Sequence, residues 1–224
     1  MAASKLRPLL APRSVALIGA SDREGSLGRV VLHNLLEAGF QGELWLVNPH
    51  RERLADRPVY ADVAHLPETP DLAVIVTPAS TVPELIAQCG ARGIAGAIVI
   101  SAGFREVGPE GEAREQAMLD AARQHGLRIL GPNCLGLIRT DVGLNATFSA
   151  GQAQPGHIAV VSQSGALCTA ILDWARSNDV GFSSLISTGV SADLDFGEIL
   201  DWLVEDPATD SIMLYVEGVQ DARR

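Results

Sequence analysis

A glycine-rich segment directly after the first apolar run has the composition of a phosphate-binding turn. Residues 19–28 read GASDREGSLG and follow the apolar run Ser14–Ile18. Glycines let the backbone approach a phosphate closely, and the free N–H groups at the start of the next helix attract an anion. The dinucleotide pattern Gly-x-Gly-x-x-Gly is absent, because Ser21 and Glu24 stand where it requires glycine. An anion-binding turn and a plain strand-to-helix turn both fit the segment.

A second segment of the same kind lies later in the chain. Residues 160–165 read VVSQSG, an apolar run followed by small polar residues and a glycine. The hydroxyls of Ser162 and Ser164 and the N–H groups after Gly165 can hold a phosphate at a helix N-terminus. Ser164 can also be an ordinary helix cap. Two such turns in one chain favour anion binding over a purely structural role.

Other residues that commonly carry catalysis are scarce. Lys5 is the only lysine, which excludes a P-loop, a Schiff-base lysine and a Ser–Lys dyad. No two histidines share metal-ligand spacing with a carboxylate, so no metal site is expected. Cys134 fits a small buried residue better than a nucleophile.

Composition and charge narrow the class of protein. The 224 residues are 47% hydrophobic with a net charge of −10, so we expect a folded chain that binds neither nucleic acid nor a membrane surface. The start of the sequence has no apolar h-region, so no signal peptide is expected, and three widely spaced cysteines favour reduced thiols and a cytoplasmic location. Residues 1–60 hold eight Lys/Arg and six Asp/Glu, net +2, whereas residues 61–224 hold nine and 21, net −12. An anionic ligand is therefore expected in the first quarter.

The elements that must position these turns alternate between strands and helices. Short apolar runs predict strands over 14–18, 44–47, 72–76, 95–100 and 127–130, with helices over 27–38, 80–91 and 109–125. This alternation predicts an α/β fold with a parallel sheet covered by helices on both faces. Ligands of such folds bind at the carboxyl ends of the strands. The second strand ends in Asn48-Pro49, without an acidic residue for a ribose, which disfavours NAD.

The pattern stops over residues 143–156 and then restarts. We interpret this stretch, GLNATFSAGQAQPG, as a linker. Beyond it, strands are expected over 157–161, 182–186 and 211–216, with helices over 165–177 and 196–204. Three strands are fewer than an open α/β sheet normally has. We therefore expect a second domain of which these residues form only a part.

As an ordered set, the turns and their neighbours resemble one protein family. The segments are SVALIGAS (14–21), VNP (47–49), TPA (77–79), SAGF (101–104), GPNCLG (131–136), LNATF (144–148), SQSG (162–165), DLDF (193–196) and YVEGVQDARR (215–224). The set is similar to the nucleoside-diphosphate-forming acyl-CoA synthetases, in particular acetate–CoA ligase (ADP-forming). It resembles the α subunit of succinyl-CoA synthetase more distantly.

The resemblance implies a Rossmann-like CoA-binding domain over residues 1–142, a linker over 143–156, and the first half of a flavodoxin-like, succinyl-CoA-ligase-like domain over 157–224. The complete enzyme would convert acyl-CoA, phosphate and ADP into acid, CoA and ATP through an acyl phosphate and a phosphohistidine. ATP and ADP would be bound by an ATP-grasp domain or subunit, and an oligomer is expected. The histidine of the family lies beyond the YVEG stretch, so these residues alone are expected to be inactive.

The resemblance also implies roles for individual residues. Arg51 would grip the 3′-phosphate of CoA, although the usual lysine is missing there. Asn133 would lie near the thiol end, and Glu217 would position the phosphohistidine. The remaining CoA contacts would come from Gly19, Ala20, Ser21, Gly25, Ser26, Asn48, Pro49, Thr77, Pro78, Ala79, Ser101, Ala102, Gly103 and Phe104. Ser162, Gln163, Ser164 and Gly165 would form the phosphate site.

Two alternatives stay open. The same two domains begin the large bacterial protein lysine acetyltransferases, where this region would bind CoA or acetyl-CoA as a regulatory module. The short sequences at residues 173–175, 181–183 and 221–223 are typical of those fusion proteins. The other alternative is a CoA-binding protein without catalysis.

We predict that the chain binds CoA more tightly than NAD. The reason is the Gly-Ala-Ser turn combined with a second strand that ends without an acidic residue. Isothermal titration calorimetry with both ligands measures the two affinities. Tighter binding of NAD than of CoA would contradict this assignment.

Overall fold

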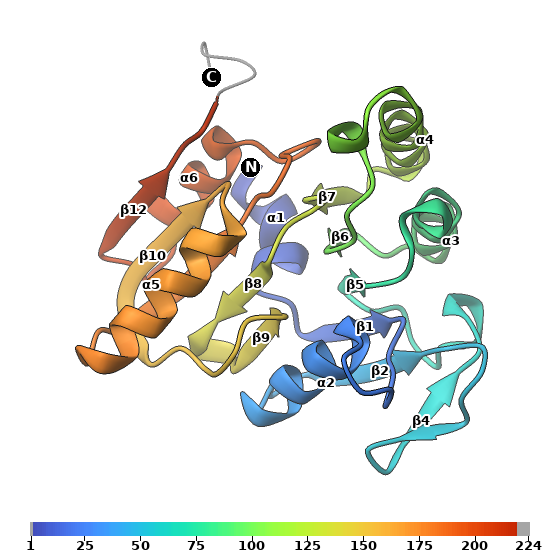
Figure 1. Cartoon of the computed structure of the whole chain (residues 1–224), viewed down its shortest axis with the longest axis horizontal. Coiled ribbons are helices and arrows are strands. Elements are labelled where there is room, and N and C mark those ends of the chain that lie inside the picture. Colours follow the sequence, from blue (N-terminus) through green and yellow to red (C-terminus); the bar gives the residue numbers. More distant parts are fainter. Residues whose placement is uncertain (1, 219–224) are drawn as a thin grey trace.

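The first half of the chain forms a seven-stranded, mostly parallel sheet. The computed structural model describes residues 2–218. The strands of this sheet are β1 (Ser14–Ile18), β2 (Glu43–Val47), β3 (Arg53–Leu54), β4 (Arg57–Tyr60), β5 (Leu72–Ile75), β6 (Gly96–Val99) and β7 (Arg128–Leu130). Their order is β3-β4-β2-β1-β5-β6-β7 (Figure 1). Neighbours from β4 to β7 pair in parallel, and β3 pairs antiparallel with β4.

Helices cover both faces of this sheet, because alternate residues of its strands point to opposite sides. In β1, Val15 and Leu17 belong to the core on one face, and Ala16 and Ile18 to the core on the other. Helices α1 (Ala2–Leu10) and α2 (Leu27–Glu37) pack on the first face, and α3 (Val82–Arg92) and α4 (Pro109–His125) on the second. Short 3₁₀ helices span Val63–His65, Ala79–Thr81, Arg105–Val107 and Thr140–Val142. Within residues 2–218, no helix has the length and apolar composition that a bilayer span needs.

The second half forms a five-stranded mixed sheet. Its strands are β8 (Gly136–Arg139), β9 (Leu144–Thr147), β10 (Pro155–Ser162), β11 (Phe182–Ser187) and β12 (Ser211–Tyr215), in the order β12-β10-β11-β8-β9. β10 pairs in parallel with β11 and β12, whereas β8 pairs antiparallel with β11 and β9. Helix α5 (Gly165–Ser177) packs on one face, and α6 (Phe196–Val204) contributes to the core on the other.

The predicted α/β class is confirmed, and each expected strand and helix is present with ends that differ by at most two residues. The linker prediction for 143–156 was wrong at both ends, since Leu144–Thr147 is β9 and β10 begins at Pro155. Together with β8, which was not anticipated either, this gives the second sheet five strands rather than three. β9 escapes a periodicity search because all four of its residues are buried, including Asn145 and Thr147, which hydrogen-bond to each other (2.7 Å). The short β3 and β4 and the helix α1 were also not anticipated.

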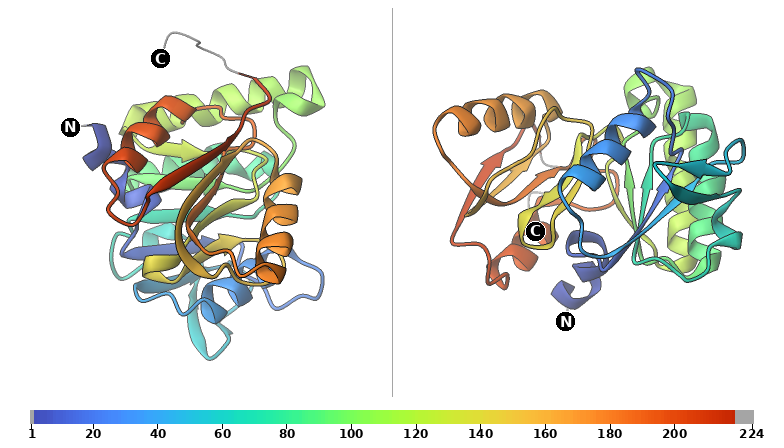
Figure 2. Two further views of the ribbon diagram at one scale, coloured as in Figure 1. Left: turned by 90° about the vertical axis from the view of Figure 1, so that its left-hand side faces the viewer. Right: turned by 90° about the horizontal axis from the view of Figure 1, so that it is seen from below.

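The two sheets share one hydrophobic core. A single cluster joins Leu17 and Leu46 of the first sheet to Val161 and Ile186 of the second. The helices α1, α2 and α6 lie in the layer between the sheets, with α3 and α4 on one outside and α5 on the other (Figure 2). Asn34 of α2 also donates hydrogen bonds to the carbonyls of Thr147, at the end of β9 (2.8 Å), and of Ser149 (2.9 Å). The relative placement of the two sheets is therefore fixed by apolar and polar contacts together.

A buried ion pair lies inside the second sheet's layer. Arg139 at the end of β8 donates to both carboxylate oxygens of Asp206 (2.7 Å each), and their side chains are only 4% and 3% exposed. Thr209 donates to the same carboxylate, and the guanidinium lies 4.8 Å from the ring centre of Trp202. Burial by itself raises the pKa of Asp206, but the hydrogen bonds from Arg139 and Thr209 outweigh it, and the pKa ends below its usual value.

We predict that Arg139→Met costs about 3–5 kcal/mol of unfolding free energy, because it leaves the Asp206 carboxylate buried without its cation. Since the folded-state pKa of Asp206 is lowered, its stabilising effect is present above the unfolded pKa and is lost as the pH falls through the folded one. Urea unfolding at neutral and acidic pH measures both effects.

The matched control is Arg123→Met, since Arg123 forms an exposed ion pair with Asp120. It should cost about 0–1 kcal/mol. If the two variants lost the same unfolding free energy at neutral pH, burial of the Arg139–Asp206 pair would not increase its contribution to stability.

Candidate ligand-binding site

A cavity of about 860 Å³ opens at the carboxyl ends of β1, β2 and β5. The strand order reverses there, because β1 lies between β2 and β5, and such a switch point is where open α/β sheets bind ligands. Most of the predicted CoA contacts line this cavity. They are Gly19, Ser21, Gly25, Ser26, Asn48, Pro49, Thr77, Pro78, Ala79, Ser101 and Ala102.

The wall formed by residues 19–28 is a tight turn that ends in a capped helix. Gly19 has a φ of +95°, and a Cβ on Gly28 would lie 2.0 Å from the Gly19 carbonyl oxygen. Ser26 caps α2, since its Oγ accepts a hydrogen bond from the N–H of Arg29 (3.3 Å). The helix N-terminus therefore begins at the cavity, with its positive dipole end toward the turn.

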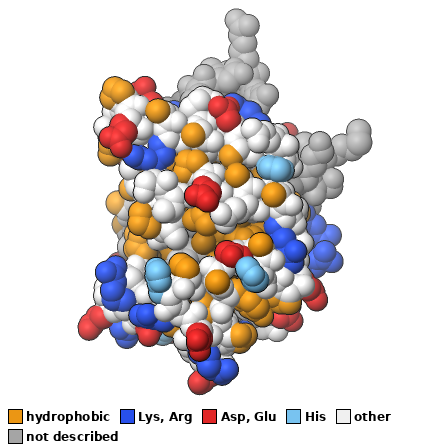
Figure 3. Space-filling model, turned by 90° about the vertical axis from the view of Figure 1, so that its right-hand side faces the viewer, with side chains coloured by type: hydrophobic (Ala, Val, Ile, Leu, Met, Phe, Trp, Pro, Cys, Tyr) orange, Lys and Arg blue, Asp and Glu red, His pale blue; other side chains and the backbone are white. Residues whose placement is uncertain are grey.

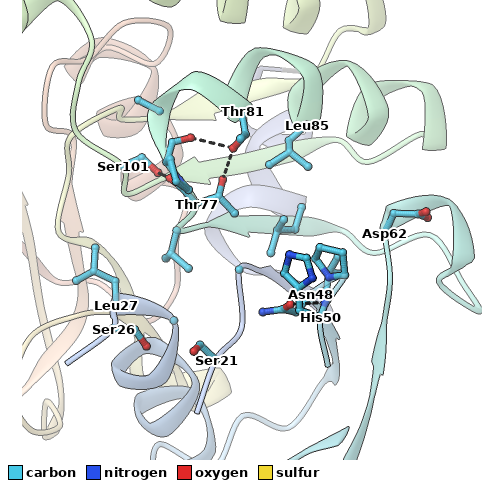
Figure 4. Close-up of a pocket in the computed structure, with 18 of the residues that line it drawn as sticks. Ser21, Ser26, Leu27, Asn48, His50, Asp62, Thr77, Thr81, Leu85 and Ser101 are labelled. Atoms are coloured by element: carbon cyan, nitrogen blue, oxygen red, sulfur yellow. Dashed lines mark hydrogen bonds between the residues drawn. The ribbon is translucent and has the colours of Figure 1, made fainter. Parts of the chain in front are cut away.

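The opposite walls are fixed by hydrogen bonds between neighbouring strand ends. Asn48 Nδ2 donates to the Ala20 carbonyl (2.7 Å), and Asn48 Oδ1 accepts from the N–H of His50 (2.8 Å). Ser101 Oγ donates to the Thr77 carbonyl (2.5 Å), which joins β6 to β5. Figure 4 shows Ser21 and Ser26 on one side of the cavity and Asp62 and Leu85 on the other.

Four predicted contact residues lie away from the cavity lining. Ala20 and Phe104 are fully buried, and Gly103 adjoins Phe104. Arg51 points to Asp22 instead, with its Nε donating to Asp22 Oδ1 at 3.1 Å. That hydrogen bond holds the pKa of Asp22 below its usual value. The guanidinium that we expected to bind a phosphate is thus engaged with a carboxylate.

Sequence reasoning missed Arg23, which is the one Lys or Arg side chain among the described residues that line the cavity. Its N–H donates to Ser21 Oγ (3.0 Å), and its carbonyl accepts from Ser26 Oγ (2.7 Å), so its backbone is held inside the turn. The surplus of cations in the first quarter of the chain was the signal for it. Asp62 and Glu84 supply acidic groups elsewhere in the cavity.

The second predicted turn is well ordered by its own side chains. Ser162 is fully buried, and its Oγ accepts from the N–H of Ser164 (3.0 Å). Ser164 caps α5 by accepting from the N–H of Leu167 (3.2 Å). Gln163 reaches to the backbone of Glu217, which lies past the end of the neighbouring β12. The structure therefore brings Glu217 and the predicted phosphate turn together.

Asn133 lies between the two predicted sites. Its N–H donates to the carbonyl of Ser101 (3.0 Å), a residue of the first cavity. On the other side, a Cβ on Gly165 would lie 3.4 Å from Leu135 Cβ. The segment around Asn133 thus connects the first cavity to the second turn. Residues 219–224 of the YVEGVQDARR motif, including 221–223, lie outside the described residues.

The Cys134 thiol is not activated as a nucleophile. Burial raises the pKa of the Cys134 thiol to about 12, so it stays protonated at neutral pH. Residues 2–218 contain no group of three or more His, Cys, Asp or Glu that could hold a metal ion. On the face over α3, α4 and β4, acidic and basic side chains are interspersed among hydrophobic ones (Figure 3).

Comparison with protein families assigns both halves of the chain. Residues 13–140 match the CoA binding domain, and residues 155–224 match the succinyl-CoA ligase like flavodoxin domain. The first match contains the cavity, and the second contains the turn at Ser162–Gly165.

Proteins that are similar over nearly the whole of this chain include ADP-forming acetate–CoA ligases. The chain is 44% identical to acetate–CoA ligase [ADP-forming] I of Archaeoglobus fulgidus, over 96% of this chain and 31% of the relative. It is 40% identical to acetate–CoA ligase [ADP-forming] I subunit alpha of Pyrococcus furiosus, over 98% of this chain and 48% of that subunit. An acetyl-coenzyme A synthetase structure from Ca. Korarchaeum cryptofilum, in complex with phosphate and ADP, superposes with a TM-score of 0.93 at 38% identity, covering 97% of this chain and 47% of that one. The chain thus spans between 31% and 48% of the length of these relatives.

We predict that Gly28→Ala destabilises the fold by about 1–3 kcal/mol, because the added methyl forces α2 away from the Gly19 carbonyl. The control is Gly165→Ala in the first turn of α5, where the nearest atom to the new Cβ lies 3.4 Å away. That variant should be neutral or gain up to about 1 kcal/mol. Thermal and urea unfolding compare them, and equal stability of the two variants would refute the close approach at Gly28.

Proposed function

Because the chain belongs to the family of CoA-binding domains, we propose that its first cavity binds CoA or acyl-CoA as part of an ADP-forming acid–CoA ligase. The observation that carries the proposal is the cavity at the β1/β5 switch point, which is lined by five strand-end turns of that domain. Its volume of about 860 Å³ suits a ligand of this size. The volume and the lining residues of the cavity thus fit CoA.

The charges in the cavity support one orientation of CoA. Arg23 and the N-terminus of α2 lie where the turn 19–28 lines the cavity, and both favour the pyrophosphate there. Asp62 lies on the other side of the cavity and would repel a phosphate (Figure 4). The amino-bearing adenine, which carries no negative charge, is compatible with that acidic wall. The Ser101 side leads to Asn133, so we assign the pantetheine arm and thiol to that direction.

The second half of the chain would contribute to phosphoryl transfer. We propose that the N–H groups at the start of α5 bind phosphate and that Glu217 orients a histidine supplied by another part of a longer protein. The ligase would interconvert acyl-CoA, phosphate and ADP with acid, CoA and ATP, and an ATP-grasp domain or subunit would bind the nucleotide. The open edge of β12 supports such a larger assembly, since Met213, Leu214, Tyr215 and Val216 are each at least 41% exposed.

We predict that Arg23→Ala weakens binding of CoA and of dephospho-CoA alike, by about 1.5–3 kcal/mol, the contribution of hydrogen bonds to a charged group. Arg51→Ala should weaken CoA by a similar amount and barely affect dephospho-CoA, if ligand binding releases Arg51 from Asp22 to the 3′-phosphate. Calorimetric titration of both variants with both ligands separates the two roles.

The outcomes of this experiment are distinct. If Arg51→Ala lowered the affinity for CoA and for dephospho-CoA equally, Arg51 would act only on the structure of the turn or on the overall electrostatic potential of the cavity. No loss with Arg23→Ala would refute the pyrophosphate orientation. Wild-type protein without affinity for CoA would refute the proposed function of the cavity.

A further inference from the structure

The side chain of Gln163 reaches from the β10–α5 turn to the chain that follows β12. Its Oε1 accepts hydrogen bonds from the N–H groups of Glu217 (2.6 Å) and Gly218 (3.0 Å). Its Nε2 donates to the carbonyl of Gly218 (3.0 Å). A carboxamide can accept and donate at one end in this way, which a carboxylate or a hydrocarbon cannot. Three hydrogen bonds therefore tie two successive backbone units to the turn.

Few other contacts define where Glu217 lies. β12 is an edge strand, and its ladder with β10 ends where the N–H of Gln163 donates to the Tyr215 carbonyl (3.2 Å). Within residues 2–218, the hydrogen bonds of Glu217 and Gly218 all go to Gln163. Strand ends without such partners open easily. The position of Glu217 thus depends on one side chain.

The base from which Gln163 extends is fixed. The neighbouring Ser162 is fully buried, and its carbonyl accepts a hydrogen bond from the N–H of Thr188 (2.9 Å) at the end of β11. Ser162 Oγ also bonds to the backbone of Ser164, which caps α5. Gln163 can therefore transmit the position of the helix N-terminus to Glu217.

We infer that Gln163 is a positioning residue that holds Glu217 beside the N-terminus of α5. The inference rests on the proposed function, in which Glu217 orients the histidine that carries the phosphoryl group. In this role Gln163 acts through the backbone of Glu217 and Gly218, to which its carboxamide is hydrogen-bonded. A catalytic group that is misplaced by about 1 Å can lose on the order of 100-fold in rate. Loss of the carboxamide should therefore slow the phosphoryl-transfer step and spare CoA binding in the separate first cavity.

The first test measures amide hydrogen exchange by NMR in the 224-residue chain. In Gln163→Met, the amides of Glu217 and Gly218 should exchange at least about tenfold faster than in the wild type, because both lose their acceptor. The matched control is Gln152→Met. Gln152 also makes three side-chain hydrogen bonds, with Asn34, Glu37 and Asn145, but these lie against α2 and β9 and not at the β10–α5 turn. It should leave exchange at Glu217 unchanged.

The second test measures acid–CoA ligase kinetics in the longer protein that the proposed function requires. Gln163→Met should lower kcat on the order of 100-fold with an unchanged KM for CoA. Gln163→Glu, which keeps the acceptor and loses the donor, should lie between Gln163→Met and the wild type. Gln152→Met should keep the wild-type kcat.

The outcomes distinguish the inference from the function on which it rests. Unchanged exchange at Glu217 and Gly218 in Gln163→Met would overturn the inference, and so would faster exchange with an unchanged kcat. In both cases a wild-type protein that turns over would leave the proposed function standing. A wild type without ligase activity would refute the proposed function, and the positioning role with it.

Discussion

The close approach of α2 to the end of β1 is the constraint on which the first domain depends. A Cβ at Gly28 would lie 2.0 Å from the Gly19 carbonyl oxygen, so this helix can begin here only without a side chain at that position. On its other side, Gly19 lies against β5, since a Cβ on it would come within 2.9 Å of Thr77 Cγ2. The turn is held between α2 and β5, and the cavity opens along it. The position of the cavity at the switch point is therefore a consequence of backbone packing.

A close backbone contact of the same kind links the two halves of the chain. A Cβ on Gly189, after β11, would lie 2.4 Å from the carbonyl oxygens of Pro132 and Asn133, so the ends of β7 and β11 pack backbone to backbone. The N–H of Val190 donates to the Pro132 carbonyl (3.0 Å). Arg128 reinforces the junction through ion pairs with Asp193 and Glu198. A ligand that extends past Ser101 thus meets a segment whose position the second sheet also determines.

The sequence was sufficient for the elements whose apolar residues follow a helix or strand period. β1, α2, α4, α5 and α6 lie where the pattern predicted them. It was insufficient where tertiary contacts decide: α1 contains Pro8, and β9 buries Asn145 and Thr147 against polar partners. The strand-end turns were predictable because topology brings them to one edge of the sheet. The direction of a long side chain was not predictable: Arg51, which the resemblance assigned to the 3′-phosphate, pairs with Asp22, and Arg23 lines the cavity.

Those two arginines show how an acidic chain can present a cation to an anionic ligand. Arg23 stands between two acidic residues in the sequence, Asp22 and Glu24. Arg51 pairs with Asp22 at 3.1 Å, and within residues 2–218 no ion pair engages Arg23. The Asp22–Arg51 pair is exposed, so solvent weakens its contribution to stability. The pair nevertheless engages one of the two carboxylates that flank Arg23 in the sequence, and Arg23 lines the cavity at the wall where α2 also directs its dipole.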